Sequence, residues 1–280
     1  MTASAHTPAA AQAPLQTTEI PARAPAVTLT VNARTATISL NRPERRNALT
    51  LVMWQGVAEA TEALASRDDI DLVVLASAAE GVFASGIDLK ELETIASDAE
   101  LREENRQAVR AAQRGLASLP MPTLAVIDGA CVGGGCGLAL HCDFRLASRR
   151  ARFGITPARL GLTYPMSDLV RLVDQLGQAA ARRLLLTADI VDADEALRLG
   201  LATWVVDDIT SSLEARCDHI LSLSATSLRT IKAHLSAVAG GQRDDDDHTI
   251  AAFLDAHESK DAREGIRAFL EKRPPKFGPL

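Results

Sequence analysis

Alternating apolar and polar positions predict a β-hairpin near the start of the chain. Residues 27–31 and 36–40 alternate and are rich in β-branched side chains, and a short polar turn separates them. The apolar spacing then changes to a helical period over 50–65. Short strand-like runs follow at 72–76, 123–127 and 143–147. A longer helical pattern over 99–119 ends at Pro120.

The alternation of strands and helices predicts an α/β core over residues 26–205. Helical patterns dominate the rest of the chain, and they predict a separate C-terminal helical region over 206–280 that either closes a site or packs against another subunit. Residues 1–25 are rich in Ala, Pro and Thr, which favours a disordered tail.

Two glycine-containing turns carry the candidate chemistry. One spans 82–91 around Gly86 and the other spans 128–138, and each follows a strand-like run and leads into a helix-like one. Such turns leave backbone N–H groups unpaired, so two turns that face each other would hold a developing oxyanion. The alternative is that the glycines only allow close packing. The second turn does not fit a dinucleotide fingerprint, because Leu138 stands where its third glycine belongs.

Composition narrows the classes of partner. The chain has 280 residues and a net charge of −6, which argues against nucleic acid. It contains no apolar run long enough for a membrane span, and its four cysteines show no metal spacing and are expected to be buried thiols. We expect a cytoplasmic protein without a metal, in which the acidic run 244–247 begins a helix and does not bind calcium.

Four segments resemble the enoyl-CoA hydratase/isomerase (crotonase) superfamily. They are residues 41–49, 83–91, 129–137 and 259–273, and they occur in the order typical of that family. The resemblance implies a ββα spiral core with a C-terminal trimerisation region, in a homotrimer or a dimer of trimers. It also implies an enzyme of the lyase class that acts on acyl-CoA thioesters, with coenzyme A as part of the substrate and no separate cofactor.

The resemblance assigns individual residues as well. It implies that the backbone N–H groups of Ile87 and Gly134 bind the thioester oxygen. The residues that it places along coenzyme A are Arg45, Arg46, Ala48, Ile87, Asp88, Leu89, Lys90, Gly134, Phe269 and Lys272. For the two arginines the alternative is a solvated surface pair, and for Phe269 and Lys272 it is helix packing and a surface charge.

The sequence departs from the hydratases of this family at both catalytic glutamates. Gly137 stands at the first position and Pro157 at the second. Pro165 stands where some isomerases carry an aspartate. Positioned acid/base groups contribute about 10²–10⁴-fold each, so hydration by two glutamates is not expected.

The stretch 153–164 resembles the methylmalonyl-CoA decarboxylase branch, which has Thr-Pro and Tyr at the positions of Thr156 and Tyr164, but Ile87 replaces that branch's histidine. Decarboxylation of a malonyl-type CoA, assisted by these two hydroxyls, is therefore the leading hypothesis. Two alternatives stay open. One is hydration or double-bond isomerisation with a non-standard acid/base, and the other is a non-catalytic acyl-CoA-binding protein. Tyr164 could also be a core phenol.

Two further polar residues lie near these motifs. Asp168 is the nearest remaining carboxylate, and it could serve as an acid/base if it turned into the pocket. The more conventional expectation is that Asp168 or Ser167 caps a helix that begins near Leu169. His141 follows the second turn on an apolar helix and is expected to be packed.

Overall fold

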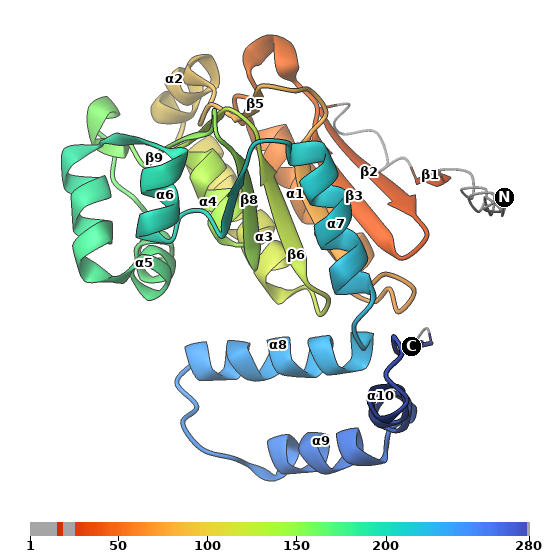
Figure 1. Cartoon of the computed structure of the whole chain (residues 1–280). Helices are drawn as coiled ribbons and strands as arrows, with labels where there is room; N and C mark the ends of the chain where they lie inside the picture. The colour runs from red at the N-terminus through yellow and green to blue at the C-terminus, as the bar shows by residue number, and fades with distance from the viewer. Residues whose placement is uncertain (1–15, 19–25, 279–280) are drawn as a thin grey trace, which may run out of the picture.

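The computed structural model describes residues 16–18 and 26–278, and a seven-stranded sheet forms its centre (Figure 1). The strand order is β1-β2-β3-β4-β6-β8-β11, with β1, β2 and β3 antiparallel and the others parallel. Their bounds are Gln16–Thr18, Val27–Asn32, Thr35–Leu40, Leu72–Ser77, Thr123–Ile127, Phe144–Ser148 and Trp204–Val206.

A second, four-stranded sheet has the order β10-β9-β7-β5. Its strands are β5 (Val82–Ala84), β7 (Ala130–Val132), β9 (Arg152–Gly154) and β10 (Ile190–Asp192). The chain forms a strand of the large sheet, then a strand of the small sheet, then one or two helices, and this order occurs three times. The repeats are β4-β5-α2-α3, β6-β7-α4 and β8-β9-α5. This confirms the predicted ββα spiral, and it places both glycine turns directly after strands of the small sheet.

Helices cover both faces of the large sheet. Alternating side chains of β4 point to opposite faces. Val73 and Leu75 join the core under α1 (Leu51–Leu64) and α3 (Ala99–Ser118), whereas Leu72 and Val74 join a cluster with Ile220 of α7 (Ile209–Leu221). The core therefore extends through α7, beyond the boundary expected at residue 205, because α7 buries its apolar side against the sheet.

Several helices near the candidate site are short or interrupted. Asp88 caps α2 (Leu89–Ser97), and Gly133 precedes α4 (Gly134–Leu140). Helix α5 (Met166–Thr187) follows the short 3-10 helix η2 (Pro157–Leu160), and α6 (Ala193–Leu199) comes next. Gly177 interrupts α5 with a non-helical φ of 76° and ψ of 164°.

Three further helices form a separate layer below the core in Figure 1. They are α8 (Ala225–Ala239), α9 (Asp247–Glu258) and α10 (Lys260–Leu270). As expected for the acidic run, Asp246 caps α9 by accepting a hydrogen bond from the N–H of Thr249 at 2.8 Å.

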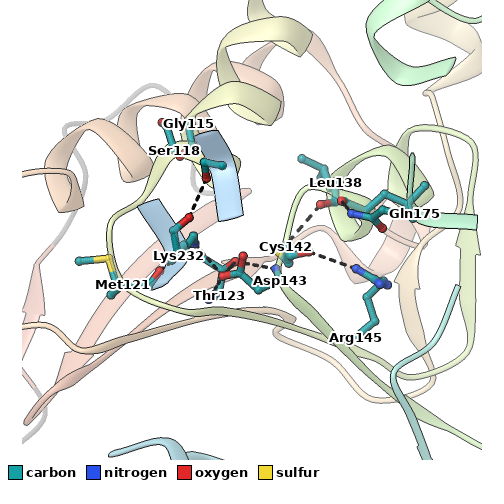
Figure 2. Close-up of polar contacts among 12 residues, drawn as sticks. Gly115, Ser118, Met121, Thr123, Leu138, Cys142, Asp143, Arg145, Gln175 and Lys232 are labelled. Atoms are coloured by element: carbon teal, nitrogen blue, oxygen red, sulfur yellow. Dashed lines mark hydrogen bonds and ion pairs between the residues drawn. The ribbon is translucent and has the colours of Figure 1, made fainter. Parts of the chain in front are cut away.

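Lys232 connects α8 to the core, as Figure 2 shows. Its ammonium donates to Asp143 Oδ2 at 2.6 Å and to the carbonyl of Met121 at 2.9 Å. The same carboxylate oxygen accepts hydrogen bonds from the N–H and the hydroxyl of Thr123 at 2.7 and 2.9 Å. Arg229 adds a hydrogen bond to the carbonyl of Ile70 at 2.8 Å. The helical layer is thus attached through polar contacts.

The N-terminal tail differs from the expectation in one place. Gln16–Thr18 form β1, which pairs antiparallel with β2. A disordered tail is therefore the wrong expectation for these three residues, because the edge of β2 offers backbone partners that composition alone does not reveal. The remaining residues of the expected tail lie outside the described part of the chain.

Cys131, Cys136 and Cys142 are buried free thiols, as expected, and Cys217 is half-buried. Over the described residues no helix is both long and apolar enough to cross a membrane.

Candidate active site

The two glycine turns touch each other through their backbones. A Cβ atom at Gly86 would lie 3.3 Å from the carbonyl oxygen of Val132, and one at Gly133 would lie 3.7 Å from Cα of Gly86. Gly86 also has a φ of 105°, which side-chain-bearing residues rarely adopt. Parallel pairing of β5 with β7 fixes this approach, so the predicted juxtaposition of the turns is present.

Each turn has an unpaired backbone N–H at the position that the resemblance implies. One neighbouring N–H in each turn is used: Asp88 donates to the carbonyl of Leu49 at 2.9 Å, and Gly133 donates to that of Gly154 at 2.8 Å. Within residues 26–278, the N–H groups of Ile87 and Gly134 donate to no protein acceptor. Both residues line a cavity of about 640 Å³. Gly134 is also the first residue of α4, where a helix leaves its N–H groups unpaired.

The first turn and its neighbour Ala48 also line the cavity. Ala48, Leu89 and Lys90 line the cavity, and Lys90 is exposed. Asp88 lines it too, but its carboxylate accepts hydrogen bonds from the N–H groups that begin α2 and from Arg42 at 2.6 Å. The bond from Arg42 is the main reason that the pKa of Asp88 is lowered. The Asp88 side chain therefore orders the turn.

The remaining predicted coenzyme A residues divide into two groups. Arg45 is exposed and lines the cavity, whereas Arg46 is exposed and outside the lining, and its carbonyl accepts a hydrogen bond from the N–H of Ser85 at 3.1 Å. Phe269 is 84% exposed on α10 and, like Lys272, is not part of the lining. Within one chain, the structure brings Arg45 but not Phe269 or Lys272 to the cavity.

Tyr164 and Thr156 both line the cavity, as the sequence predicted. The hydroxyl of Tyr164 donates to the carbonyl of Gly133 at 2.9 Å, one residue before the Gly134 donor. Burial raises the pKa of the phenol well above its ordinary value, so it stays protonated. The hydroxyl proton is used in the hydrogen bond to the second turn. Tyr164 thereby helps to hold the backbone N–H of Gly134 in place.

The positions of the two missing glutamates also face this region. Pro157 lines the cavity at the start of η2. A Cβ atom at Gly137 would lie 2.9 Å from Nε2 of Gln113 and 3.7 Å from the hydroxyl of Tyr164. The space that a glutamate would need beyond Gly137 is thus partly filled by the Gln113 amide.

Asp168 lies in the cavity wall and does not cap a helix. Helix α5 begins at Met166 after Pro165, with no side-chain cap, so the expected capping by Ser167 or Asp168 is wrong. Pro165 has a φ of −59°, which suits the residue just before a helix, and the helix therefore starts earlier than expected. Asp168 is 6% exposed and lines the cavity.

Gln113 is the residue that the sequence interpretation missed. It is 2% exposed on α3 and lines the cavity. Val109, Ala112, Gln113 and Leu116 follow the i, i+3, i+4, i+7 spacing of a buried helix face. A polar amide at such a position is a signal that sequence alone could have given, because buried polar groups need partners.

His141 is packed, as expected. It is 5% exposed, its Nδ1 lies 2.7 Å from the carbonyl oxygen of Gly137, and burial lowers its pKa to about 4. The neutral ring therefore stabilises the C-terminal end of α4 through its contact with the Gly137 carbonyl.

Comparison with known proteins agrees with this arrangement. The sequence profile described as enoyl-CoA hydratase/isomerase matches residues 30–279. A crotonyl-CoA hydratase of Syntrophomonas wolfei is 32% identical over 248 residues, which cover 86% of this chain and 94% of that protein. This chain belongs to the enoyl-CoA hydratase/isomerase family.

Solved structures extend the likeness to three dimensions. An enoyl-CoA hydratase/carnithine racemase from Magnetospirillum magneticum has a TM-score of 0.86 and 32% identity, over 91% of this chain and 96% of that one. An enoyl-CoA hydratase from Bacillus anthracis has a TM-score of 0.82 and 27% identity, over 91% and 100% of the two chains. The enoyl-CoA hydratase/isomerase fold thus accounts for the core and for the C-terminal helices alike.

Proposed function

We propose that this chain binds an acyl-CoA thioester in the cavity and stabilises its enolate. The observation that carries the proposal is the contact between two turns that have unpaired N–H groups at Ile87 and Gly134. The thioester oxygen would accept both hydrogen bonds as negative charge develops on it. Removal of one such donor typically costs about 10²–10³-fold in rate. The related proteins named as crotonyl-CoA and enoyl-CoA hydratases support this substrate class.

Coenzyme A would enter beside the first turn as part of the substrate, with no separate cofactor. Arg45 and Lys90 supply positive charge at the cavity, which suits the phosphates of a nucleotide. The prediction that Phe269 and Lys272 reach coenzyme A then requires a neighbouring subunit. We accordingly propose a homotrimer or a dimer of trimers, built through the C-terminal helices.

Among enolate reactions, the geometry favours hydration or double-bond isomerisation with a non-standard acid/base. Gly137 and Pro157 provide no carboxylate, whereas Asp168 is a buried carboxylate in the cavity wall. One carboxylate beside an oxyanion hole is sufficient to move a proton between carbons of a conjugated system.

Decarboxylation of a malonyl-type CoA is the second candidate, and the hydroxyls of Thr156 and Tyr164 in the cavity support it. Loss of CO₂ leaves its electron pair in the same enolate and needs only a later proton. The hydrogen bond from Tyr164 to Gly133 weakens this hypothesis, because that hydroxyl is already donating.

A substrate panel tests the order of these candidates. Purified protein would be assayed with crotonyl-CoA, a 3-enoyl-CoA and methylmalonyl-CoA, with Tyr164→Phe measured in parallel. We expect conversion of an enoyl-CoA. Release of CO₂ from methylmalonyl-CoA without enoyl-CoA conversion would reverse the order. Calorimetric binding of a CoA thioester with no turnover of any substrate would instead identify a non-catalytic acyl-CoA-binding protein.

A further inference from the structure

Asp168 has an unusual environment for a carboxylate. It is 6% exposed, and its Oδ1 is buried without a hydrogen-bond partner among the described residues. A buried polar atom without a partner costs free energy, and an ionised one costs more. Such a group is therefore expected to have a function that offsets its cost. Its position in the cavity wall points to a bound ligand as the missing partner.

The groups that face Asp168 come from α3 and from the segment before α5. Burial raises the pKa of Asp168, while a hydrogen bond with Gln113 and the positive charge of Arg110 lower it, and burial prevails. Tyr164 lies close enough for the Asp168 charge to contribute to the raised pKa of the phenol. A carboxyl group whose pKa is raised in this way accepts a proton more readily than an exposed aspartate does.

Gln113 links Asp168 to the position of the first missing glutamate. Its Nε2 lies 2.9 Å from the place of a Cβ atom at Gly137, and its side chain is close enough to Asp168 to lower the pKa of that carboxyl group. The amide therefore occupies the space beside Gly137 and lies in the same cavity wall as the carboxylate from α5. Gln113 is thus the neighbour that Gly137, at the position of the first missing glutamate, and Asp168 have in common.

We propose that Asp168 is the catalytic acid/base of this enzyme and transfers the proton at the α-carbon of the bound thioester. The assignment rests on the proposed enolate chemistry. In the forward step, Asp168 Oδ1 takes the α-proton, and the C–H electron pair moves into the enolate, whose oxygen the N–H groups of Ile87 and Gly134 bind. In the return step, the neutral carboxyl group gives a proton to carbon and the thioester carbonyl re-forms.

Deuterium exchange into a saturated thioester tests the proposal whatever the natural substrate is. Butyryl-CoA would be incubated with the protein in D₂O, and α-deuteration would be followed by mass spectrometry. Wild-type protein should exchange the α-protons. Asp168→Asn should slow exchange by about 10²–10⁴-fold. Asp168→Glu should restore part of the rate, because it returns a carboxylate to the wall.

The matched control is Asp174→Asn, since Asp174 is an exposed carboxylate on the same helix. It should exchange at the wild-type rate. Wild-type exchange should also rise with pH through an apparent pKa above the ordinary aspartate value, and Asp168→Asn should lose that dependence. A merely structural role for Asp168 would not change the pH profile.

The outcomes separate this inference from the proposed function. Calorimetry with butyryl-CoA and circular dichroism would establish that Asp168→Asn still binds ligand and is folded. Exchange at the wild-type rate in that variant overturns the role of Asp168 and leaves the enolate chemistry intact. Binding by wild-type protein without any exchange also overturns the role of Asp168. Failure of wild-type protein to bind any CoA thioester overturns the proposed function itself.

Discussion

The spiral core and the C-terminal helices α8–α10 differ in how much apolar side-chain surface they leave exposed. In the core, Ile38, Leu75 and Leu116 have no exposed surface. In α8–α10, large apolar side chains such as Leu235, Phe253 and Phe269 are 64%, 63% and 84% exposed. A large exposed apolar patch on a protein commonly marks an interaction surface. The comparison teaches that large apolar side chains are mostly buried in the core, whereas α8–α10 expose many of theirs, which supports the proposed assembly through these helices.

The largest expected effect comes from charging that helical layer. Leu235→Glu combined with Phe253→Glu places two carboxylates on α8 and α9, and burial of an unpaired charge in an interface is strongly unfavourable. The proposed trimer should dissociate to single chains of 29.7 kDa, as measured by size-exclusion chromatography with light scattering. Leu197→Glu on α6, an exposed leucine of the core, is the control and should keep the wild-type mass. A monomeric wild-type protein would contradict the inference that the exposed apolar side chains of α8–α10 lie in an interface.

A substitution in the first glycine turn of the core should lower activity and leave the assembly intact. Gly86→Ala adds a Cβ atom at a φ of 105° and only 3.3 Å from the Val132 carbonyl oxygen, so it should shift the adjacent Ile87 N–H. We expect kcat/KM for the identified acyl-CoA substrate to fall by about 10²-fold. Gly161→Ala is the matched control, because Gly161 has a φ of 68° and open space around it. Equal losses in both variants would show that backbone strain alone was responsible.

The junction between the two regions should respond to loss of Lys232. Lys232→Met removes hydrogen bonds to Asp143 and to the Met121 carbonyl while it retains the apolar stem. Charge-assisted bonds of this kind contribute about 1.5–3 kcal/mol, which corresponds to a decrease of several degrees in the melting temperature. Differential scanning calorimetry would measure the decrease. Lys260→Met, at an exposed position of α10, should change the melting temperature by less than about a degree.

The smallest expected effect is a gain in stability at the candidate active site. The pKa of Asp168 is raised on folding, so the folded state disfavours its ionised form. This penalty is absent below the pKa of the unfolded chain, and it grows as the pH rises through the pKa of the folded state. Asp168→Asn should therefore melt at a temperature similar to that of wild type near pH 3.5, and a few degrees higher at pH 7–8. A difference that does not change with pH would contradict this reasoning.

Long elements could be predicted from the sequence because their signals are local. The helix expected over 50–65 is α1 at 51–64, where Thr50 caps the first turn, and the helix expected over 99–119 is α3 at 99–118. The small sheet could not be predicted in the same way. Its strands β5, β7 and β9 have three residues each, which is too few to show a period.

The site shows the same division between local and distant signals. The two turns could be predicted because glycine and strand signals adjoin in the sequence, and the family resemblance then implied Ile87 and Gly134. The arrangement of Gln113 with Asp168 could not, since residues from α3 and α5 meet only after the spiral has closed. Capping is the simpler expectation for Asp168 because a helix start can be recognised locally, whereas the interior of a cavity cannot.

The interruption of α5 at Gly177 has a kinetic consequence. Helices elongate cooperatively because each residue extends an existing ladder of hydrogen bonds, and Gly177 divides that ladder in two. Residues 166–176, which include Asp168, can then open as a unit without unfolding the second half of the helix. Their amides would exchange with solvent through local opening, and a ligand in the cavity would slow that exchange. The wall that carries the proposed acid/base can thus open without loss of the second half of α5.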